Sequence, residues 1–367
     1  EDGFLHVDFS NLAGTPVIHA YGDTVRRVIP TAAGARWKAL LKAHPDSALT
    51  KAIVFGQESV LPITSLTPVN GTGFFTDFLA NEVNDAMLIV THESLMSAAQ
   101  AYANYREISI RNPYNTVLVD VDELYDQFGG GVPKHAFAIR RWCRYLLDSW
   151  ATSPKALFLI GKSVQNVTVN QFVPGIRPDA AGAYQTCLVP TFGHPASDVA
   201  FTIGLRFDPT VVEIPVGRLS VYTPDEVLAY LAKVQALESQ TPGVWMKNIL
   251  HFAGGFDPGE TGGFVNYLNG LKAVAVDTSF GGSVSTFRKS SSETFQSASA
   301  DSVRTLIQEG VTLMTFLAHA YASSFDITID DPVNYQWNGK HPLVIGNSCY
   351  IGNIHQNNRL SQGEGWV

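Results

Sequence analysis

Cysteine is scarce in this chain. Only three of its 367 residues are cysteines, namely Cys143, Cys187 and Cys349. They form no CxxC pair and no cluster with histidine at the spacing of metal ligands. The sequence therefore predicts neither a disulfide framework nor a zinc site.

Basic charge and long apolar runs are also lacking. Charged residues make up 16% of the chain and the net charge is −8, which argues against a nucleic-acid binder with a basic face. No apolar run approaches the roughly 20 residues of a membrane span. The chain begins with Glu1 and Asp2 and shows no basic-then-apolar signal peptide, so we expect a mature or trimmed chain. Few Lys and Arg, with abundant Ser, Thr, Asn, Gly and aromatic residues, suit an extracellular protein.

Apolar residues, in contrast, are plentiful. They form 45% of the chain, enough to bury a large core and to exclude a disordered protein. A length of 367 residues is too great for one small core, so two or three structural units are expected.

Residues 1–80 have the texture of a β-rich segment. Short alternating runs such as FLHVDF and TPVIHAYG are separated by Gly, Pro and Thr. One helix is predicted over Ala35–Ala43, where Trp37, Leu40 and Leu41 would share a face. No residue pattern here suggests chemistry, so a supporting or docking role is the expectation.

Residues 81–205 alternate strand and helix and form the first predicted α/β subdomain. Strands are expected over Ala86–Thr91, Asn115–Val121 and Ala156–Lys162. Helices are expected over Ser94–Arg106 and Pro133–Trp150.

Residues 206–367 repeat this plan as a second predicted α/β subdomain. Strands are expected over Val211–Val221 and Lys247–Gly255, a polar loop or surface insertion over 281–300, and a helix over Asp301–Glu309. The fold class is therefore α/β, with mainly parallel sheets flanked by helices and a β-rich segment before them.

Two of the predicted strands in the second subdomain end in chemically useful residues. The apolar run Val311–Leu317 leads to His319, and Leu343–Ile345 leads to Cys349. Open α/β sheets place their sites just beyond the carboxyl ends of strands. An imidazole beside a thiol ionises and orients it, as thiol catalysis requires.

Each of these residues also has an ordinary structural interpretation. A single cysteine after a strand is more often a small buried hydrophobic residue than a nucleophile. A single histidine is more often structural or exposed than catalytic. At this point the catalytic and structural interpretations of Cys349 and His319 are about equally supported.

The sequence resembles the gingipain-like cysteine peptidases, a family that includes the sortase of the type IX secretion system. The resemblance covers about residues 85–355 and its specific parts are VEIPVGRLSVYTPDEVLAYLAKV, TLMTFLAHAYASSFD and VIGNSCYIGNIH. It implies a caspase-like fold of two α/β subdomains with the active site in the second. It also implies that Cys349 is the nucleophile, His319 its base and Glu213 the acid that orients the imidazole.

The resemblance further implies an oxyanion site formed by the backbone amides of Cys349 and Ala320. Here the sequence departs from the family, which usually has glycine at the position of Ala320. A backbone N–H survives this change where φ is negative. The family also continues with further strand and helix after the cysteine, whereas this sequence stops at Val367.

The function implied is that of a cysteine endopeptidase. The first hypothesis is a type IX secretion sortase that removes C-terminal signal domains from secreted cargo, located outside the cell or at the bacterial surface. It would act on peptides or proteins and contact outer-membrane secretion components. The alternatives are a secreted degradative peptidase of the family and a catalytically silent binding scaffold. Specificity, oligomeric state and the choice between the first two stay open.

Several further polar residues have weaker assignments. His194 and Asp198 are predicted to line the substrate cleft, and His355 is read as a loop or cleft residue. Catalysis is expected to need no cofactor. Calcium could bind the clustered Asp326, Asp330 and Asp331, but their spacing fits no known loop, so a solvated acidic turn is preferred.

Overall fold

The computed structural model of the chain divides into two compact units, Glu1–Gly73 and Phe74–Val367. The structure describes residues 3–22, 24–43, 49–165, 179–291, 293–294, 296–298, 300–321, 324–357 and 361–366. In this described part, no helix is both long enough and apolar enough to cross a membrane.

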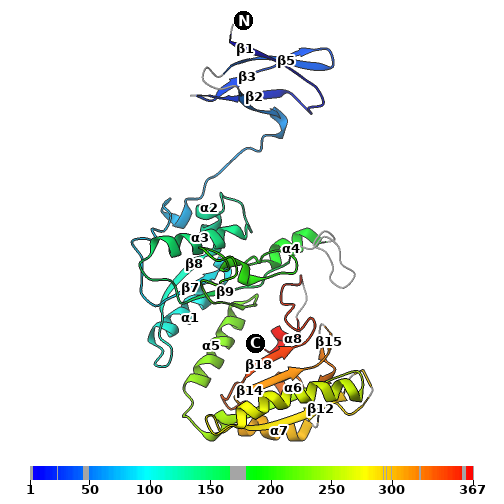
Figure 1. Cartoon of the computed structure of the whole chain (residues 1–367). Coiled ribbons are helices and arrows are strands. Elements are labelled where there is room, and N and C mark those ends of the chain that lie inside the picture. Colours follow the sequence, from blue (N-terminus) through cyan, green and yellow to red (C-terminus); the bar gives the residue numbers. More distant parts are fainter. Residues whose placement is uncertain are drawn as a thin grey trace. The chain divides into compact units, whose positions relative to one another are not determined.

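The first unit contains two antiparallel three-stranded sheets. Their strand orders are β1-β5-β4 and β3-β2-β6, and Figure 1 labels β1, β2, β3 and β5. Ile18, Ala20 and Leu41 form its small buried core. The strands are β1 (Phe4–Phe9), β2 (Pro16–Tyr21), β3 (Arg26–Val28), β4 (Thr31–Ala33), β5 (Arg36–Lys42) and β6 (Lys51–Gly56).

The helix predicted over Ala35–Ala43 is wrong, because this stretch is strand β5. Trp37, Leu40 and Leu41 fit a helical face, but burial along β5 alternates with the two-residue period of a strand. Leu41 is buried, whereas Leu40 is 52% exposed. Pairing with β1 and β4 on either side outweighs the helical spacing.

The second unit begins with a four-stranded parallel sheet of order β10-β9-β7-β8. Helices cover both faces, α2 and α3 on one core and α1 and α5 on the other. All six residues of β7 are buried, as expected for a central parallel strand. The elements are β7 (Ala86–Thr91), α1 (Met96–Ile108), β8 (Asn115–Asp120), α2 (Val121–Phe128), α3 (Phe137–Ser149), β9 (Ala156–Ile160), α4 (Ala180–Thr186), β10 (Val216–Leu219) and α5 (Pro224–Glu238).

This topology moves the predicted boundary between the subdomains. The boundary after residue 205 is wrong, because β10 pairs with β9 in the first sheet. Helix α5 packs its buried Val227 and Leu231 into the core that α1 also lines. The first subdomain therefore extends through α5, and the second begins with β11.

The second subdomain is built on a parallel sheet of order β12-β11-β14-β18, with α6 lying across it (Figure 1). A short hairpin, β15-β16, follows β14. The elements are β11 (Asn248–Ala253), α6 (Pro258–Val276), β12 (Ser283–Arg288), β13 (Gln296–Ser297), α7 (Ala300–Glu309), β14 (Leu313–Leu317), β15 (Ala320–Tyr321), β16 (Ser324–Phe325), β17 (Ile327–Thr328), β18 (Leu343–Asn347) and α8 (Gln362–Gly365).

The predicted helix that ends at Glu309 is confirmed as α7. Of the two predictions for 281–300, the loop is wrong for the residues that form β12 and β13, and the surface insertion remains a prediction. Ser283 and Ser285 flank the buried Val284, and β12 pairs with β11 along its full length. The polar composition reflects the position of β12 at one end of the sheet order, where fewer of its side chains are enclosed.

Candidate active site

The register of the second sheet brings the turns that carry Cys349 and His319 together. Leu317 at the end of β14 is paired with Asn347 at the end of β18. Two residues beyond this pair stand His319 and Cys349. Ser348 Oγ donates a hydrogen bond to the carbonyl oxygen of Ala318 at 2.6 Å, which ties the residues immediately before them. Adjacent strands lie about 4.8 Å apart, so the two residues occupy neighbouring positions beyond the carboxyl ends of the strands.

The imidazole of His319 is held by a carboxylate and an aromatic ring. Its Nε2 lies 2.9 Å from Glu260 Oε1. Its ring stacks on Phe256 with a centroid separation of 3.8 Å and an interplanar angle of 14°. The side chains of His319 and Glu260 are 27% and 32% exposed, so this pair is partly open to solvent. The contact at Nε2 leaves Nδ1 as the ring nitrogen available to a thiol.

Glu260 itself is fixed by the start of helix α6. Asp257 caps this helix by accepting the N–H groups of Gly259 and Glu260, and Pro258 stands at its first position. Glu260 Oε2 accepts the backbone N–H of Phe256 at 2.7 Å. This bond, with the His319 contact next in size, lowers the pKa of the Glu260 carboxyl. The carboxylate is therefore oriented by the same turn that presents Phe256 to the imidazole.

The acid that contacts the imidazole is thus Glu260, and the assignment of this role to Glu213 is not supported. Glu213 precedes β10, a strand of the first sheet, and its N–H bonds to Thr202 O at 3.1 Å. Glu260 follows β11, the strand adjacent to β14. The rule that strand ends carry chemistry points to the loop after β11, but only the strand order shows that this loop adjoins His319.

Cys349 differs from the other two cysteines in its exposure. It is exposed on the turn after β18, whereas Cys143 and Cys187 are buried. Burial raises the pKa of Cys143 to about 12 and raises that of Cys187 as well, so both remain protonated thiols. The next residue, Tyr350, has a φ of 58°, which turns the chain sharply after the cysteine. Among the contacts of the described residues, no hydrogen bond joins Cys349 to His319.

The hairpin after His319 determines where the Ala320 amide points. Asp326 N donates to His319 O at 2.8 Å, and Ala320 is paired with Phe325. Hydrogen-bonded and non-hydrogen-bonded pairs alternate in antiparallel strands, so the Ala320 N–H points away from β16. Ala320 is not among the residues with positive φ, so alanine is tolerated where glycine is usual in the family.

The segment after Cys349 is anchored in the first subdomain. His355 is 8% exposed; its Nδ1 is hydrogen-bonded to Ser163 Oγ, and its carbonyl oxygen accepts Gln165 N–H at 2.8 Å. Lys162 Nζ forms an ion pair with Glu364. Burial, with a further contribution from the charge of Arg218, lowers the pKa of His355 to about 4. His355 lies in a turn, in agreement with the prediction of a loop residue, but its ring is buried and serves as an anchor.

The two residues predicted to bind substrate differ in their surroundings. Asp198 accepts hydrogen bonds from Arg218 Nε at 2.6 Å and from Arg218 Nη2 at 2.8 Å. Burial opposes the charged form of Asp198, but Arg218 outweighs it and lowers the pKa. This arginine of the family-like VGRLS motif also donates to three backbone carbonyls, so the pair is structural. His194 is exposed on its loop, and its binding role remains a prediction.

The acidic group after His319 is not a solvated turn. Asp326 is 0% exposed and pairs with Lys289, whereas Asp330 pairs with Arg304 and Asp331 caps a short helical turn. Throughout the part of the chain that the structure describes, no three His, Cys, Asp or Glu residues form a group that could hold a metal ion.

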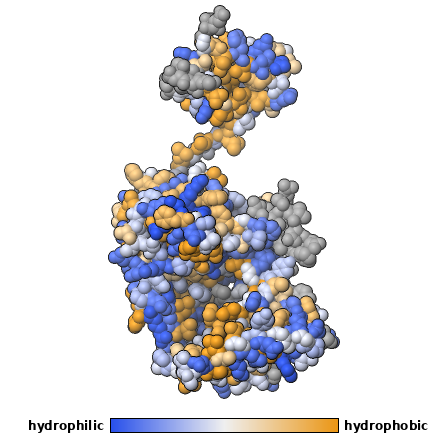
Figure 2. Space-filling view, viewed as in Figure 1, coloured by the Kyte–Doolittle hydropathy of each residue, from blue (hydrophilic) through white to orange (hydrophobic). Residues whose placement is uncertain are grey.

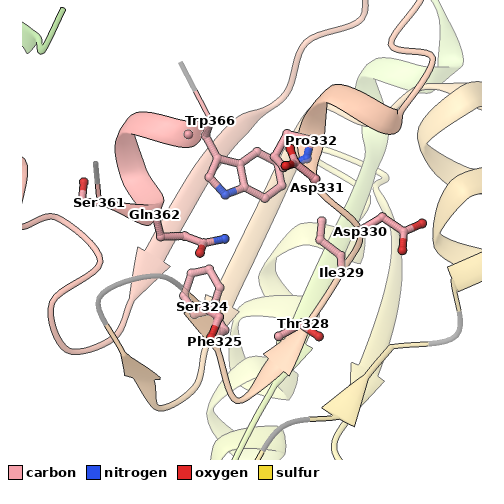
Figure 3. A pocket seen from close by; sticks show the side chains of 11 residues that line it. Ser324, Phe325, Thr328, Ile329, Asp330, Asp331, Pro332, Ser361, Gln362 and Trp366 are labelled. Carbon is pink, nitrogen blue, oxygen red and sulfur yellow. The ribbon is translucent and has the colours of Figure 1, made fainter. Parts of the chain in front are cut away.

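Two hollows border this part of the second subdomain. One has a volume of about 690 Å³ and is lined by residues on both sides of Cys349, including Gly346, Ile351 and Gly352, as well as by α5. Figure 2 shows hydrophobic surface in the region where α5 and β18 lie in Figure 1. The other, of about 340 Å³, lies beyond the hairpin, with Trp366 and Gln362 on one side and Thr328 and Ile329 on the other (Figure 3).

Three adjacent parallel strands thus lead to a thiol, an imidazole and a carboxylate. These are the groups used in thiol-dependent acyl transfer. The model of peptidase family C25 matches residues 81–367. The chain belongs to peptidase family C25.

Solved structures give the same fold. The Arg-specific cysteine proteinase gingipain R (RgpB) is 12% identical, with a TM-score of 0.55, over 77% of this chain and 58% of that one. The complex of Porphyromonas gingivalis RgpB pro- and mature domains is 11% identical, with a TM-score of 0.55, over 76% and 59% of the two chains. A structure described only as a protease is 15% identical, with a TM-score of 0.56, over 77% and 56%. This chain thus spans about 58% of the length of RgpB in the first match. No curated protein sequence matches it.

Proposed function

We propose that the chain is a cysteine endopeptidase that uses Cys349, His319 and Glu260. The hydrogen bond between His319 Nε2 and Glu260, beside the strand end that carries Cys349, is the observation that supports this most strongly. A carboxylate on Nε2 orients the imidazole and fixes its tautomer, leaving Nδ1 to take the thiol proton.

In this mechanism the Cys349 thiolate attacks the carbonyl carbon of the substrate peptide bond. The amides of Cys349 and Ala320 bind the oxygen that becomes negative, a contribution of about 3 kcal/mol per donor. The imidazolium of His319 then gives its proton to the leaving amine, and the acyl group remains on sulfur as a thioester. Attack by water, or by an amine in a transpeptidation, releases the product.

The larger of the two hollows, lined by residues that precede and follow Cys349 in the chain, supports a preference for apolar substrate side chains. Its described lining includes Trp337, Trp366, Leu343 and Ile351, with Lys233 and His341 as its basic residues and no carboxylate. A basic side chain would find no opposite charge there, whereas apolar groups would gain by leaving water.

We further propose that the enzyme processes secreted partner proteins, outside the cell or at the bacterial surface, rather than degrading protein generally. Two features support this proposal, namely the larger, apolar hollow and the β-rich first unit, which would serve as a docking module. Contacts away from the cut bond can supply binding energy that short substrates lack. A sortase of type IX secretion that removes C-terminal signal domains, at outer-membrane secretion components, fits this description; a degradative peptidase is the alternative.

Equal amounts of enzyme should act very differently on casein and on a cargo protein that carries a C-terminal signal domain. We expect one cut at the domain junction of the cargo, little loss of casein, and no cleavage of either by Cys349→Ala. Product masses measured over time provide the readout. Rapid digestion of casein into many fragments by the wild type, but not by Cys349→Ala, would replace the processing role with a degradative one.

A further inference from the structure

A buried ion pair lies directly beneath the His319 turn. Asp326 Oδ2 is 3.5 Å from Lys289 Nζ, and their side chains are 0% and 1% exposed. Asp326 Oδ2 also accepts the backbone N–H of Gly255 at 2.8 Å, while Lys289 donates to the carbonyl oxygen of Gly255 at 3.1 Å. Both charged groups therefore bind the same residue of the loop after β11.

This pair contacts the backbone on both sides of the imidazole. On one side, Asp326 N–H bonds to His319 O at 2.8 Å. On the other side, Gly255 directly precedes Phe256, whose ring stacks on the imidazole and whose N–H holds Glu260. A movement of Asp326 would therefore displace His319 and its support relative to each other.

The loop is shaped to fit this carboxylate. A Cβ added at Gly254 would lie 2.0 Å from Asp326 Oδ1 and 2.8 Å from the Cβ of Ala318, so only glycine fits between them. Asp326 Oδ1 is buried without a hydrogen-bond partner among the described residues. A buried pair with an unsatisfied oxygen is a poor source of stability compared with apolar packing, which favours a role at the site.

The alternative of a calcium site at Asp326 does not fit these contacts. The ammonium group of Lys289 stands where a cation would bind the carboxylate. The other two acids of the cluster have their own partners, since Asp330 binds Arg304 and Asp331 accepts the N–H of Val333.

We infer that the Asp326–Lys289 pair is a positioning device that holds His319 and its Glu260–Phe256 support in the arrangement needed to activate Cys349. This inference rests on the proposed thiol mechanism. Asp326 and Lys289 act through other residues and do not touch the substrate.

The test uses Asp326→Asn, which keeps an acceptor for the Gly255 N–H but removes the charge opposite Lys289. The expected result is a fall in kcat of about 10- to 100-fold with little change in KM, since misplacement by an ångström can cost that much. The rate of Cys349 alkylation by iodoacetamide, measured against pH in the full chain, should lose the His319-assisted rise and approach that of His319→Ala. Lys289→Met should have the same effects, and it replaces Asp326→Asn in the test if that variant folds poorly.

Glu238→Gln is the matched control, because Glu238 forms a mostly buried pair with Arg106 between α5 and α1. It should lower the free energy of unfolding without changing kcat or the alkylation profile. If Asp326→Asn and Lys289→Met leave the profile of the wild type unchanged, the positioning role is refuted while the thiol mechanism stands. If the wild type already alkylates like His319→Ala, the thiol mechanism fails, and the inference fails with it.

Discussion

Replacing Glu260 by Gln should lower kcat about 10²- to 10⁴-fold, the range that general acid–base catalysis and an orienting carboxylate supply. Glutamine retains an oxygen that can accept the Phe256 N–H, so the turn is kept. It loses the negative charge that stabilises the imidazolium formed as Cys349 gives up its proton. Because that charge acts mainly in the transition state, KM should change by no more than about threefold. Steady-state cleavage of a cargo protein provides both constants.

Glu213→Gln is the comparison that decides between the two carboxylates. Glu213 lies before a strand of the first sheet, whereas Glu260 contacts the imidazole, so Glu213→Gln should retain kcat within about twofold. A large fall in kcat for Glu213→Gln, with Glu260→Gln close to the wild type, would reverse the assignment made from the geometry.

Acid should destabilise the wild-type chain between pH 6.5 and 4 because of His355. Its pKa is about 4 in the folded chain, below the ordinary 6.5, since burial and then Arg218 disfavour the charged ring. The unfolded chain therefore takes up a proton on this ring first. The stability that the neutral ring provides is complete above pH 6.5 and falls as the pH drops to 4, by about 3 kcal/mol in all.

His355→Asn should remove this part of the pH dependence, because asparagine can bond to Ser163 but does not titrate. The measurement is the free energy of urea unfolding of the full chain at pH 7 and pH 4.5, compared between variant and wild type. Groups that do not interact with His355, such as His251 with its lowered pKa, are common to both chains and cancel. His194→Asn, at an exposed loop histidine, should follow the wild type. If the free energy of unfolding falls by the same amount between pH 7 and pH 4.5 in all three chains, the fold does not hold His355 neutral.

The strands that carry the site could be predicted from sequence because their apolar runs are short and bounded by turn residues. The runs before His319 and Cys349 became β14 and β18, neighbours in one parallel sheet. The β5 stretch was mistaken for a helix because Trp37, Leu40 and Leu41 satisfy a helical spacing, and only pairing with β1 reveals the two-residue period.

The third member of the site could not be predicted in the same way. An acid three residues after Asp257 has the ordinary interpretation of a helix-capping residue, and Glu260 does serve that turn. Its second role depends on β11 lying next to β14, and strand order is not evident in the sequence. The motif acid Glu213 was therefore the more visible candidate.

The partners of three further polar residues could not be predicted from the sequence either. The sequence favours turn or cleft positions for Asp326, His355 and Asp198, because isolated charged side chains are usually exposed. Each has a partner elsewhere in the chain, Lys289, Ser163 and Arg218 respectively. Asp326 and His355 are buried, and the Asp198 side chain is 14% exposed. Such pairs become visible only when the fold brings the partners together.

The most direct test of the account is covalent labelling of the native chain by an apolar peptidyl chloromethyl ketone. Intact mass and peptide mapping should show one adduct, on Cys349, because Cys143 and Cys187 are buried thiols with raised pKa values. Labelling should be absent in Cys349→Ala and much slower in His319→Ala. Equal labelling of the three cysteines, or labelling of Cys349 at the same rate without His319, would contradict a thiol nucleophile activated by this histidine.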